Sequence, residues 1–292
     1  MKHLSKLIVS AGVCLCLSGA ITGQHQKNTH LTEVTAQANL SGYTLSKPDA
    51  RYLLPGELRE ISGLTLVSDN SFACVQDEKG TIFIYDFRQN KITNRYNFHD
   101  DGDYEGLVQV GQTMYVLRSD GRIIKVENYA SKEPQVTVLQ TKVPAQESEG
   151  INYDARQQRL LIATKSQPNH ADKDERGIFA FDLKAQTLAQ QPVLKFNQEK
   201  LLDKFKDRKK PEFQPSGLAV HPLTQHLYVL SANDPFIAVF DKNGKVLQVL
   251  PLNKKLFNQP EGITFNANGD MFISNESGGG PATVLRFNYK SS

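Results

Sequence analysis

The stretch Gln259-Pro260-Glu261-Gly262-Ile263 is the clearest copy of a motif that occurs five times along the chain. The other copies are Glu60-Ile61-Ser62-Gly63-Leu64, Asp103-Tyr104-Glu105-Gly106-Leu107, Glu147-Ser148-Glu149-Gly150-Ile151 and Gln214-Pro215-Ser216-Gly217-Leu218. The glycines of successive copies lie 43, 44, 67 and 45 residues apart. A period in the low forties, with short strand-like runs between the copies, is typical of β-propeller blades. The repeat therefore predicts an all-β fold in which each copy begins the innermost strand of one blade.

The runs between the copies are short, rich in β-branched and aromatic residues, and separated by Asn-Gly, Asp-Gly and Lys-Gly turns, which are hairpin signals. Four strands fit in each full interval, but only three fit between the last copy and the end of the chain. A spare strand over 43–54 precedes the first copy and can supply the missing one. We predict five blades of four antiparallel strands, with the ring closed by the N-terminal strand.

The long interval between the third and fourth copies holds about twenty residues more than one blade requires. The excess lies near 197–213, where Leu201, Leu202 and Phe205 are interspersed with Lys and Asp, as in a short amphipathic helix. We expect one propeller domain over 42–292 with a helical insertion there. A six-bladed ring is the alternative. The basic run over 204–210 is interpreted as a solvated helix face, or else as a docking patch for an anionic partner.

The first twenty residues have the pattern of an export signal. Lys2 and Lys6 precede an apolar stretch over 7–17, and Ser18-Gly19-Ala20 offers a site for signal peptidase. We expect a signal peptide over 1–20 and a flexible polar linker over 21–41. If the segment is not cleaved, it would be the chain's only contact with a membrane.

Charge and cysteine content narrow the location and the partners. The 34 Lys and Arg nearly balance the 31 Asp and Glu, whereas nucleic-acid binders normally carry a basic stripe, so we expect no nucleic-acid partner. Cleavage of the signal would remove Cys14 and Cys16 and leave Cys74 alone. Export without disulfides fits a Gram-negative periplasm, with a secreted or membrane-anchored protein as the alternative. We expect a monomer.

The residues one and three positions before each marker glycine project to the same side of the strand. Because innermost strands line the axis of a propeller, these side chains should meet at one mouth of the central channel. All ten carry oxygen acceptors: Ser62, Glu105, Glu149, Ser216 and Glu261 directly before the glycine, and Glu60, Asp103, Glu147, Gln214 and Gln259 three before it. The ends of the second strands add Arg118, Lys165, Asn275 and Glu276.

Glu105, Glu149 and Glu261 are the candidate metal ligands at this channel mouth. Three carboxylates in a narrow space repel one another, so a hard cation, the charges of Arg118 and Lys165, or raised pKa values must offset the repulsion. Oxygen ligands without His or Cys favour Ca²⁺ or Mg²⁺. The alternative is structural, with the carboxylates accepting hydrogen bonds from backbone amides of neighbouring blades, and the two roles are compatible.

At these residues the sequence resembles the SdiA-regulated family of bacterial envelope β-propellers. The resemblance covers 43–289 and rests on the ordered motifs Ile61-Ser62-Gly63-Leu64, Tyr104-Glu105-Gly106-Leu107, Ser148-Glu149-Gly150-Ile151, Pro215-Ser216-Gly217-Leu218-Ala219-Val220-His221-Pro222, Pro260-Glu261-Gly262-Ile263-Thr264-Phe265 and Ile273-Ser274-Asn275-Glu276. It implies an exported or membrane-tethered propeller.

The Glu-Gly motif is more distantly similar to that of calcium-dependent lactonase and phytase-like propellers, in which acids at the channel mouth hold the metal. This chain departs from them by placing Ser62 and Ser216 at two of the five positions and by lacking an obvious His base near the mouth. His221 follows an innermost strand and starts a turn, so we assign it a structural role.

Two functions remain open. The first is a binding or scaffold module that receives a small molecule or a protein at the propeller rim, with a divalent cation at the mouth as an option. The second is a metal-dependent hydrolase of a lactone or phosphoester, in which Glu105, Glu149 or Glu261 positions water. The sequence has no Gly-x-Ser-x-Gly motif and no Cys/His pair suited to nucleophilic catalysis, so whether the protein is an enzyme stays open.

Overall fold

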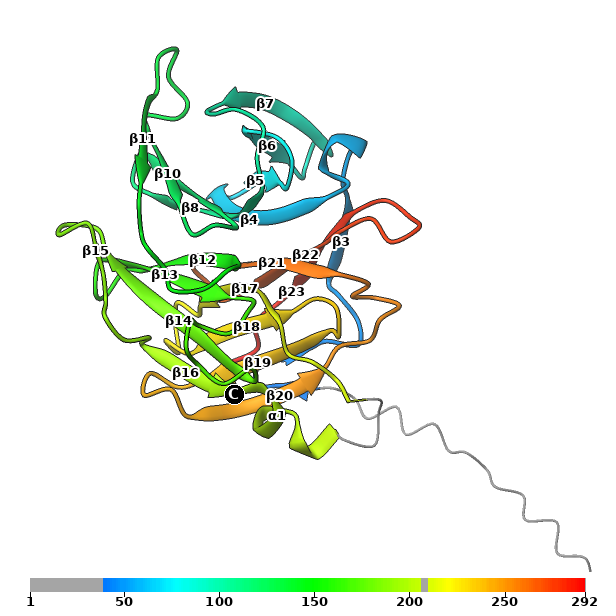
Figure 1. Ribbon diagram of the computed structural model, residues 1–292. Coiled ribbons are helices and arrows are strands. Elements are labelled where there is room, and N and C mark those ends of the chain that lie inside the picture. The colour runs from blue at the N-terminus through cyan, green and yellow to red at the C-terminus, as the bar shows by residue number, and fades with distance from the viewer. Residues whose placement is uncertain (1–38, 206–209, 292) are drawn as a thin grey trace, which may run out of the picture. The chain divides into compact units, whose positions relative to one another are not determined.

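The computed structural model describes residues 39–205 and 210–291, which belong to one compact unit, 37–292. Five antiparallel sheets surround a common axis as the blades of a β-propeller (Figure 1). The predicted fold class and the number of blades are confirmed, and the six-bladed alternative is wrong. The predicted signal peptide and the predicted linker up to residue 38 lie outside the described residues.

Each blade begins at one copy of the repeated motif. The first blade contains β4 (Ile61–Ser68), β5 (Ser71–Gln76), β6 (Thr81–Asp86) and β7 (Lys91–Asn97). The second contains β8 (Tyr104–Val110), β9 (Thr113–Arg118), β10 (Ile123–Glu127) and β11 (Gln135–Leu139). The third contains β12 (Ser148–Asp154), β13 (Arg159–Thr164) and β14 (Glu175–Asp182), and its outer strand is split into β15 (Thr187–Leu188) and β16 (Leu194–Asn197). The fourth contains β17 (Pro215–Val220), β18 (Leu227–Ser231), β19 (Phe236–Phe240) and β20 (Val246–Pro251).

The fifth blade joins the two ends of the chain. It contains β21 (Pro260–Phe265), β22 (Met271–Asn275), β23 (Thr283–Phe287) and β3 (Ala50–Leu53), and β3 pairs antiparallel with β23. Closure by the N-terminal strand is therefore confirmed, although the strand is shorter than the predicted 43–54. The residues before it form a separate small sheet of β1 (Asn39–Leu40) and β2 (Tyr43–Thr44), and the 3₁₀ turn η1 (Gly56–Leu58) follows β3. Leu40, which we expected in the linker, is buried.

The apolar core is divided into five clusters, one between each pair of neighbouring blades. Between the fifth and first blades, for example, the rings of Phe72 and Phe272 lie 5.2 Å apart. Each sheet is thus covered on both faces, so the middle strands are apolar on both faces, and every residue of β22 is buried. This arrangement explains why the strand-like runs are continuous rather than alternating.

The insertion after the third blade contains one helical turn, α1 (Gln198–Leu201), followed by the 3₁₀ turn η2 (Asp203–Phe205). The Oδ1 atom of Asn197 caps α1 by accepting a hydrogen bond from the Lys200 amide at 3.0 Å. Leu201 and Leu202 pack into the cluster between the third and fourth blades. Much of the basic run lies outside the described residues. Neither α1 nor any other helix within 39–205 and 210–291 has the length and apolarity needed to cross a membrane.

Candidate functional site at the channel mouth

Every innermost strand carries a β-bulge at the repeated motif. The pairing register shifts between Ile61 and Gly63, Tyr104 and Gly106, Ser148 and Gly150, Pro215 and Gly217, and Pro260 and Ile263. The residue directly before the glycine lies inside each bulge. A bulge redirects a side chain and is frequent beside functional sites. The five residues at this position therefore share one backbone irregularity.

The marker glycines allow the neighbouring blades to approach one another closely. A Cβ atom on Gly63 would lie 2.6 Å from the Cα of Gly106 in the next blade, and one on Gly150 would lie 3.1 Å from the Cα of Gly217. A residue without a side chain is needed where two backbones come this close. The repeated glycine is thus a packing requirement of the ring.

The central channel is closed next to the mouth. The cavity on the axis is lined by aliphatic residues that follow the marker glycines and by polar residues that precede them: Leu64, Leu107, Ile151, Leu218 and Ile263, and Ser62, Glu105, Ser216 and Glu261. The axial cavity has a volume of about 10 Å³, room for about one water molecule. This cavity is therefore too small for an organic ligand.

Glu105, Glu149 and Glu261, the predicted metal ligands, come together at this mouth. Glu105 is hydrogen-bonded to Asp103 and donates a hydrogen bond to Glu149. The Oε1 atom of Glu149 lies 2.8 Å from the Lys165 Nζ, and Glu261 is hydrogen-bonded to Gln259. The structure thus brings the three carboxyls into one electrostatic cluster, as the repeat predicted.

Burial raises the pKa of each of these carboxyls. Burial and the charges of Glu149 and Asp103 raise the pKa of Glu105 to about 10. Burial also raises the pKa of Glu149, against the opposing effects of Lys165 and of the hydrogen bond from Glu105. The pKa of Glu261 is raised well above its ordinary value by burial and then by the charges of Glu276 and Glu149. At neutral pH the mouth therefore holds protonated carboxyls.

Lys165 is the cation around which the acids gather. Its charge lowers the pKa of Glu105, Glu149, Glu261 and Glu276. Arg118, the other predicted cation, does not join them. Its guanidinium lies 5.9 Å from the ring centre of Tyr104 and 3.6 Å from an Asp120 carboxylate oxygen. The expectation that Arg118 would help to offset the acids is corrected, because Asp120 and Tyr104 hold its side chain.

A repeated backbone hydrogen bond holds the outer residues of the mouth in four of the five blades. The amide after the second strand donates to the carbonyl three residues before the glycine: Asp77 to Glu60 at 3.3 Å, Ser119 to Asp103 at 3.0 Å, Lys165 to Glu147 at 3.0 Å, and Glu276 to Gln259 at 3.1 Å. These bonds place further carboxyls around the cluster.

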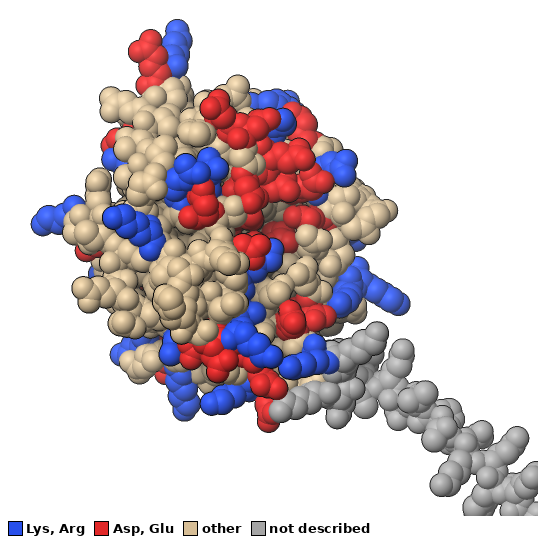
Figure 2. Space-filling view, viewed as in Figure 1, with Lys and Arg blue, Asp and Glu red and all other residues tan. Residues whose placement is uncertain are grey.

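The acids of the first and fifth blades act on one another through this arrangement. Burial and the charges of Asp77 and Glu60 raise the pKa of Glu276 to about 7. Burial and the charges of Glu60, Glu78 and Asp103 raise the pKa of Asp77. Figure 2 shows acidic side chains gathered in a continuous patch over the blade formed by β4–β7. Asp77 was missing from the predicted binding set, although it occupies the same position after its second strand as Glu276.

Ser62 and Ser216 make inter-blade hydrogen bonds, although as donors to backbone carbonyls and not as the acceptors from backbone amides that we considered for the carboxylates. The Ser62 hydroxyl donates to the Tyr104 carbonyl at 2.6 Å, and the Ser216 hydroxyl donates to the Pro260 carbonyl at 2.7 Å. Each bond joins one blade to the next at the level of the bulges. The glutamates at the equivalent positions bond to side chains instead, so their chemistry is separate from this connection.

Two buried oxygen atoms at the mouth have no hydrogen-bond partner among the described residues: Asn275 Oδ1 and Asp77 Oδ1. Asn275 is fully buried, and its amide nitrogen lies 3.4 Å from Thr283 Oγ1. Unsatisfied oxygens beside carboxyls of raised pKa suit a hard cation chemically. Within 39–205 and 210–291, however, no three His, Cys, Asp or Glu side chains are arranged as a ligand set for a metal ion.

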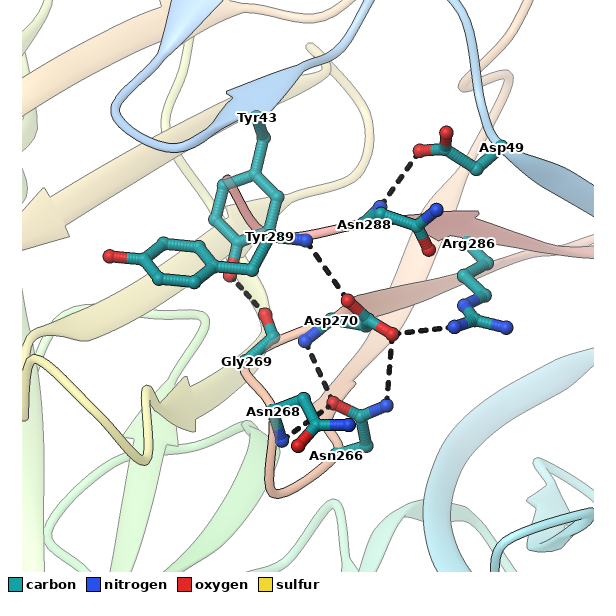
Figure 3. A network of polar contacts seen from close by, with 9 residues as sticks. All are labelled: Tyr43, Asp49, Asn266, Asn268, Gly269, Asp270, Arg286, Asn288 and Tyr289. Atoms are coloured by element: carbon teal, nitrogen blue, oxygen red, sulfur yellow. Dashed lines mark hydrogen bonds and ion pairs between the residues drawn. The ribbon is translucent and has the colours of Figure 1, made fainter. Parts of the chain in front are cut away.

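The opposite end of β21 holds the ring closure rather than a site (Figure 3). Asp270 Oδ2 accepts hydrogen bonds from Arg286 at 2.6 Å and from Asn266 at 3.0 Å, and Asp270 Oδ1 accepts one from the Tyr289 amide at 3.0 Å. The Tyr43 hydroxyl donates to the Gly269 carbonyl. These bonds tie the N-terminal segment and the C-terminal residues to the fifth blade.

His221 packs against this closure. Its ring centre lies 4.7 Å from that of Tyr289, and its Nδ1 accepts hydrogen bonds from the amides of Leu223 and Thr224 at 3.3 and 3.1 Å. The side chain is fully buried, and burial lowers its pKa to about 4. The imidazole is therefore neutral and structural, at the end of the blades away from the mouth.

Comparisons with known proteins agree with the architecture. A family model described as SdiA-regulated matches residues 37–287. No curated protein matches the chain. Among solved structures, the glutaminyl cyclase of Myxococcus xanthus is similar, with a TM-score of 0.58, 12% sequence identity, and coverage of 84% of this chain and 97% of that one. A luciferin-regenerating enzyme has a TM-score of 0.49 and 11% identity over 83% of this chain and 95% of its own. At 12% identity, the likeness to the glutaminyl cyclase concerns the fold alone.

Proposed function

The chain is a member of the SdiA-regulated family, and from this premise we propose that it is an exported binding module of the periplasm whose acidic mouth holds a divalent cation. Ca²⁺ is the first candidate and Mg²⁺ the second, because every available ligand is an oxygen. A protein or small molecule would then dock at the rim around the cation. The module is monomeric in this proposal.

The observation that carries the proposal is the cluster of carboxyls with raised pKa values around a single ammonium group. Burial raises the pKa of Glu105 to about 10 and also raises the pKa of Glu261, and the charge of Lys165 offsets this only in part. A bound cation supplies further positive charge, so its binding would release the protons of these carboxyls to solvent. The unsatisfied oxygens of Asn275 and Asp77 add two further ligands. The Asn275 amide oxygen can bind a cation without losing a proton, and the Asp77 oxygen belongs to a carboxyl group.

The closed channel supports binding at the mouth over a reaction inside the ring. A cavity of about 10 Å³ excludes a lactone or a phosphoester from the axis. A cation, by contrast, needs only a small space among carboxyls that act on one another electrostatically. The proposal therefore places the ligand above the ring of bulges, in contact with Glu105, Glu149, Glu261 or Glu276.

Calorimetric titration of the full chain with CaCl₂, and separately with MgCl₂, tests this proposal. Binding should release protons, so the apparent enthalpy should change between two buffers of different ionisation enthalpy. Glu261→Gln should abolish the signal, while Glu133→Gln, an exposed acid in the turn between β10 and β11, should leave it unchanged. Absence of binding by either cation, with no shift in melting temperature on chelation, rejects the proposal.

One observation favours the hydrolase as a second candidate. Glu276 has a pKa of about 7, which suits a general base at neutral pH, and it lies beside the proposed cation. In that case the cation polarises the substrate and Glu276 accepts a proton from water. A panel of lactones and phosphoesters, assayed with the Ca²⁺-loaded wild type and with Glu276→Gln, separates the two. Equal and negligible rates leave binding as the function.

A further inference from the structure

A second cavity, of about 500 Å³, lies beside α1 and shares no lining residue with the cavity on the propeller axis. It is bordered by the loop between β13 and β14, by α1 and by the residues that precede β17. The volume lies within the range of small-molecule sites, which is roughly 300–1,000 Å³. Nothing in the proposed function uses this cavity.

The floor of the cavity contains Arg176, a buried cation. The residue is 4% exposed, and its Nη1 donates to the carbonyls of Lys173 and Glu175, both at 2.9 Å. Its Nε is buried and has no hydrogen-bond partner in the part of the chain that the structure describes. Burial lowers the pKa of Arg176 even though Glu212 and Asp174 act in the opposite direction. The neighbouring acids therefore leave this guanidinium incompletely compensated.

The Arg176 side chain lines the cavity, and a guanidinium is a receptor for a carboxylate. Its planar N–H groups match the two oxygens of a carboxylate, and a buried charge is costly unless it is paired. Lys173 and Lys210, which also line the cavity, add positive charge at its edge. The anionic half of a ligand thus has a defined position.

The same cavity also presents negative charge. Asp174 accepts a hydrogen bond from Gln198 at 3.1 Å, and Glu212 accepts one from Gln214 at 3.1 Å. Glu199 lines the cavity as well. A simple anion would be repelled by these acids, whereas a ligand that carries both charges can satisfy both sets. The apolar lining, Leu202 and Pro211, suits a small hydrocarbon part.

We propose that this cavity binds a small zwitterion of the α-amino-acid class, with its carboxylate on Arg176 and its ammonium group facing Glu212 and Glu199. The charge pattern selects against dicarboxylates and against amines without a carboxylate. The site is independent of the channel mouth, so Glu261→Gln should not affect it.

A thermal-shift screen of the full chain against the common α-amino acids, each at about 10 mM, tests the proposal, since even a millimolar dissociation constant is then detected. The best ligand is next titrated beside its analogue without the amino group and its analogue without the carboxylate. Each analogue should bind about tenfold or more weakly, as expected for the loss of one charged hydrogen-bonding group. Failure of every amino acid to bind overturns the proposal, as does a carboxylic acid that binds as tightly as its amino acid.

Variants locate the binding. Arg176→Gln should abolish it, and Glu212→Gln should weaken it about tenfold or more. The control is Lys195→Ala, an exposed lysine on β16 that pairs with Glu175 and does not line the cavity; it should bind as the wild type does. Arg176 also holds the loop before it, so Arg176→Gln could fail to fold. In that case the Glu212→Gln and Lys173→Ala variants test the placement of the ligand. Unchanged affinity in both of these overturns the placement.

Discussion

One ammonium group sets the charge balance of the channel mouth. Lys165 touches Glu149 directly and acts on three further carboxyls, while Arg118 is held by Asp120 and Tyr104. Carboxyls buried in this way resist ionisation, so each unit of positive charge near them changes which are protonated. The residues of the mouth are therefore best tested by removing charges one at a time.

Replacing Lys165 by Met should destabilise the fold in a pH-dependent way. Glu149, whose side chain is 8% exposed, would lose its cation, so its pKa should rise further. The free energy of unfolding should fall by about 1–3 kcal/mol at pH 8 and by much less at pH 4, where a carboxyl of raised pKa is protonated and needs no cation. Urea denaturation at the two pH values measures the difference. Lys195→Met, which removes an exposed ion pair with Glu175, should show little effect at either pH.

Replacing Glu276 by Gln should have the opposite effect on stability. The folded-state pKa of about 7 exceeds the ordinary 4.5, so the folded state binds more protons and loses stability as pH rises from 4.5 through 7. The Gln variant escapes this loss and should be more stable than the wild type at pH 8 by about 1 kcal/mol, after allowance for solvent screening. At pH 4 the two should unfold alike. Melting curves at both pH values check this, and equal stability at pH 8 would contradict it.

At the scale of the elements, the bulge in each innermost strand performs two tasks. It turns one side chain toward the mouth, and it lets the following glycine meet the next blade. Where that side chain is Ser62 or Ser216, it bonds to the next blade; where it is Glu, it joins the acid cluster. The same element thus serves as a connector in two blades and as part of the candidate site in three.

Substitution of a marker glycine tests the packing role of this element. Gly63→Ala would place a Cβ atom 2.6 Å from the Gly106 Cα, so the blades must separate, and we expect a loss of about 3 kcal/mol or more in the free energy of unfolding. The matched control is Gly56→Ala in η1, where a Cβ would meet nothing within 4 Å. Chemical denaturation of both variants provides the comparison. A Gly63→Ala protein as stable as its control would show that the ring tolerates wider spacing.

The repeat alone was sufficient to predict the blades, because the marker glycine and its flanking acids recur wherever an innermost strand begins. It also predicted that Glu105, Glu149 and Glu261 lie together. The orientation of the Arg118 side chain could not be predicted, because it depends on contacts with Asp120 and with the ring of Tyr104. These contacts do not recur in the other blades' copies of the motif. The cavity at Arg176 was missed for a related reason: its only signal was a lone Arg at the start of an apolar strand.

At the scale of the whole molecule, the two ends of the blades respond to pH in opposite directions. At the mouth, the folded-state pKa values of Glu105 and Glu276 are raised, so the folded protein loses stability as these acids ionise with rising pH. At the other end, burial lowers the pKa of His221 to about 4, so the folded state resists its protonation. Asp270, whose pKa is lowered by the Tyr289 amide and by Arg286 and Asn266 against burial, weakens the ring closure only below its ordinary 3.8. A stability optimum between these limits follows.

The acid side of this profile should come from His221. An unfolded His with a pKa of 6.5 binds a proton before the folded one does, so stability should decline as pH falls from 6.5 to 4, by at most about 3 kcal/mol. In His221→Gln this decline should be much smaller, whatever the variant's absolute stability. His170→Gln, at an exposed position, should keep the wild-type slope. Unfolding free energies measured in steps across this pH range test whether His221 causes the decline. Identical slopes in all three proteins would contradict this assignment.

The pairing of β3 with β23 has a consequence for how the protein is made. During synthesis, residues 50–53 emerge long before their partner strand at 283–287 and stay unpaired until almost the whole polypeptide has left the ribosome. Four blades can assemble meanwhile, but the fifth cannot, so the ring stays open to the end of translation. For the exported protein proposed above, this delay would be useful, because the final architecture cannot form until both partners of the fifth blade's last strand pair have reached the same compartment.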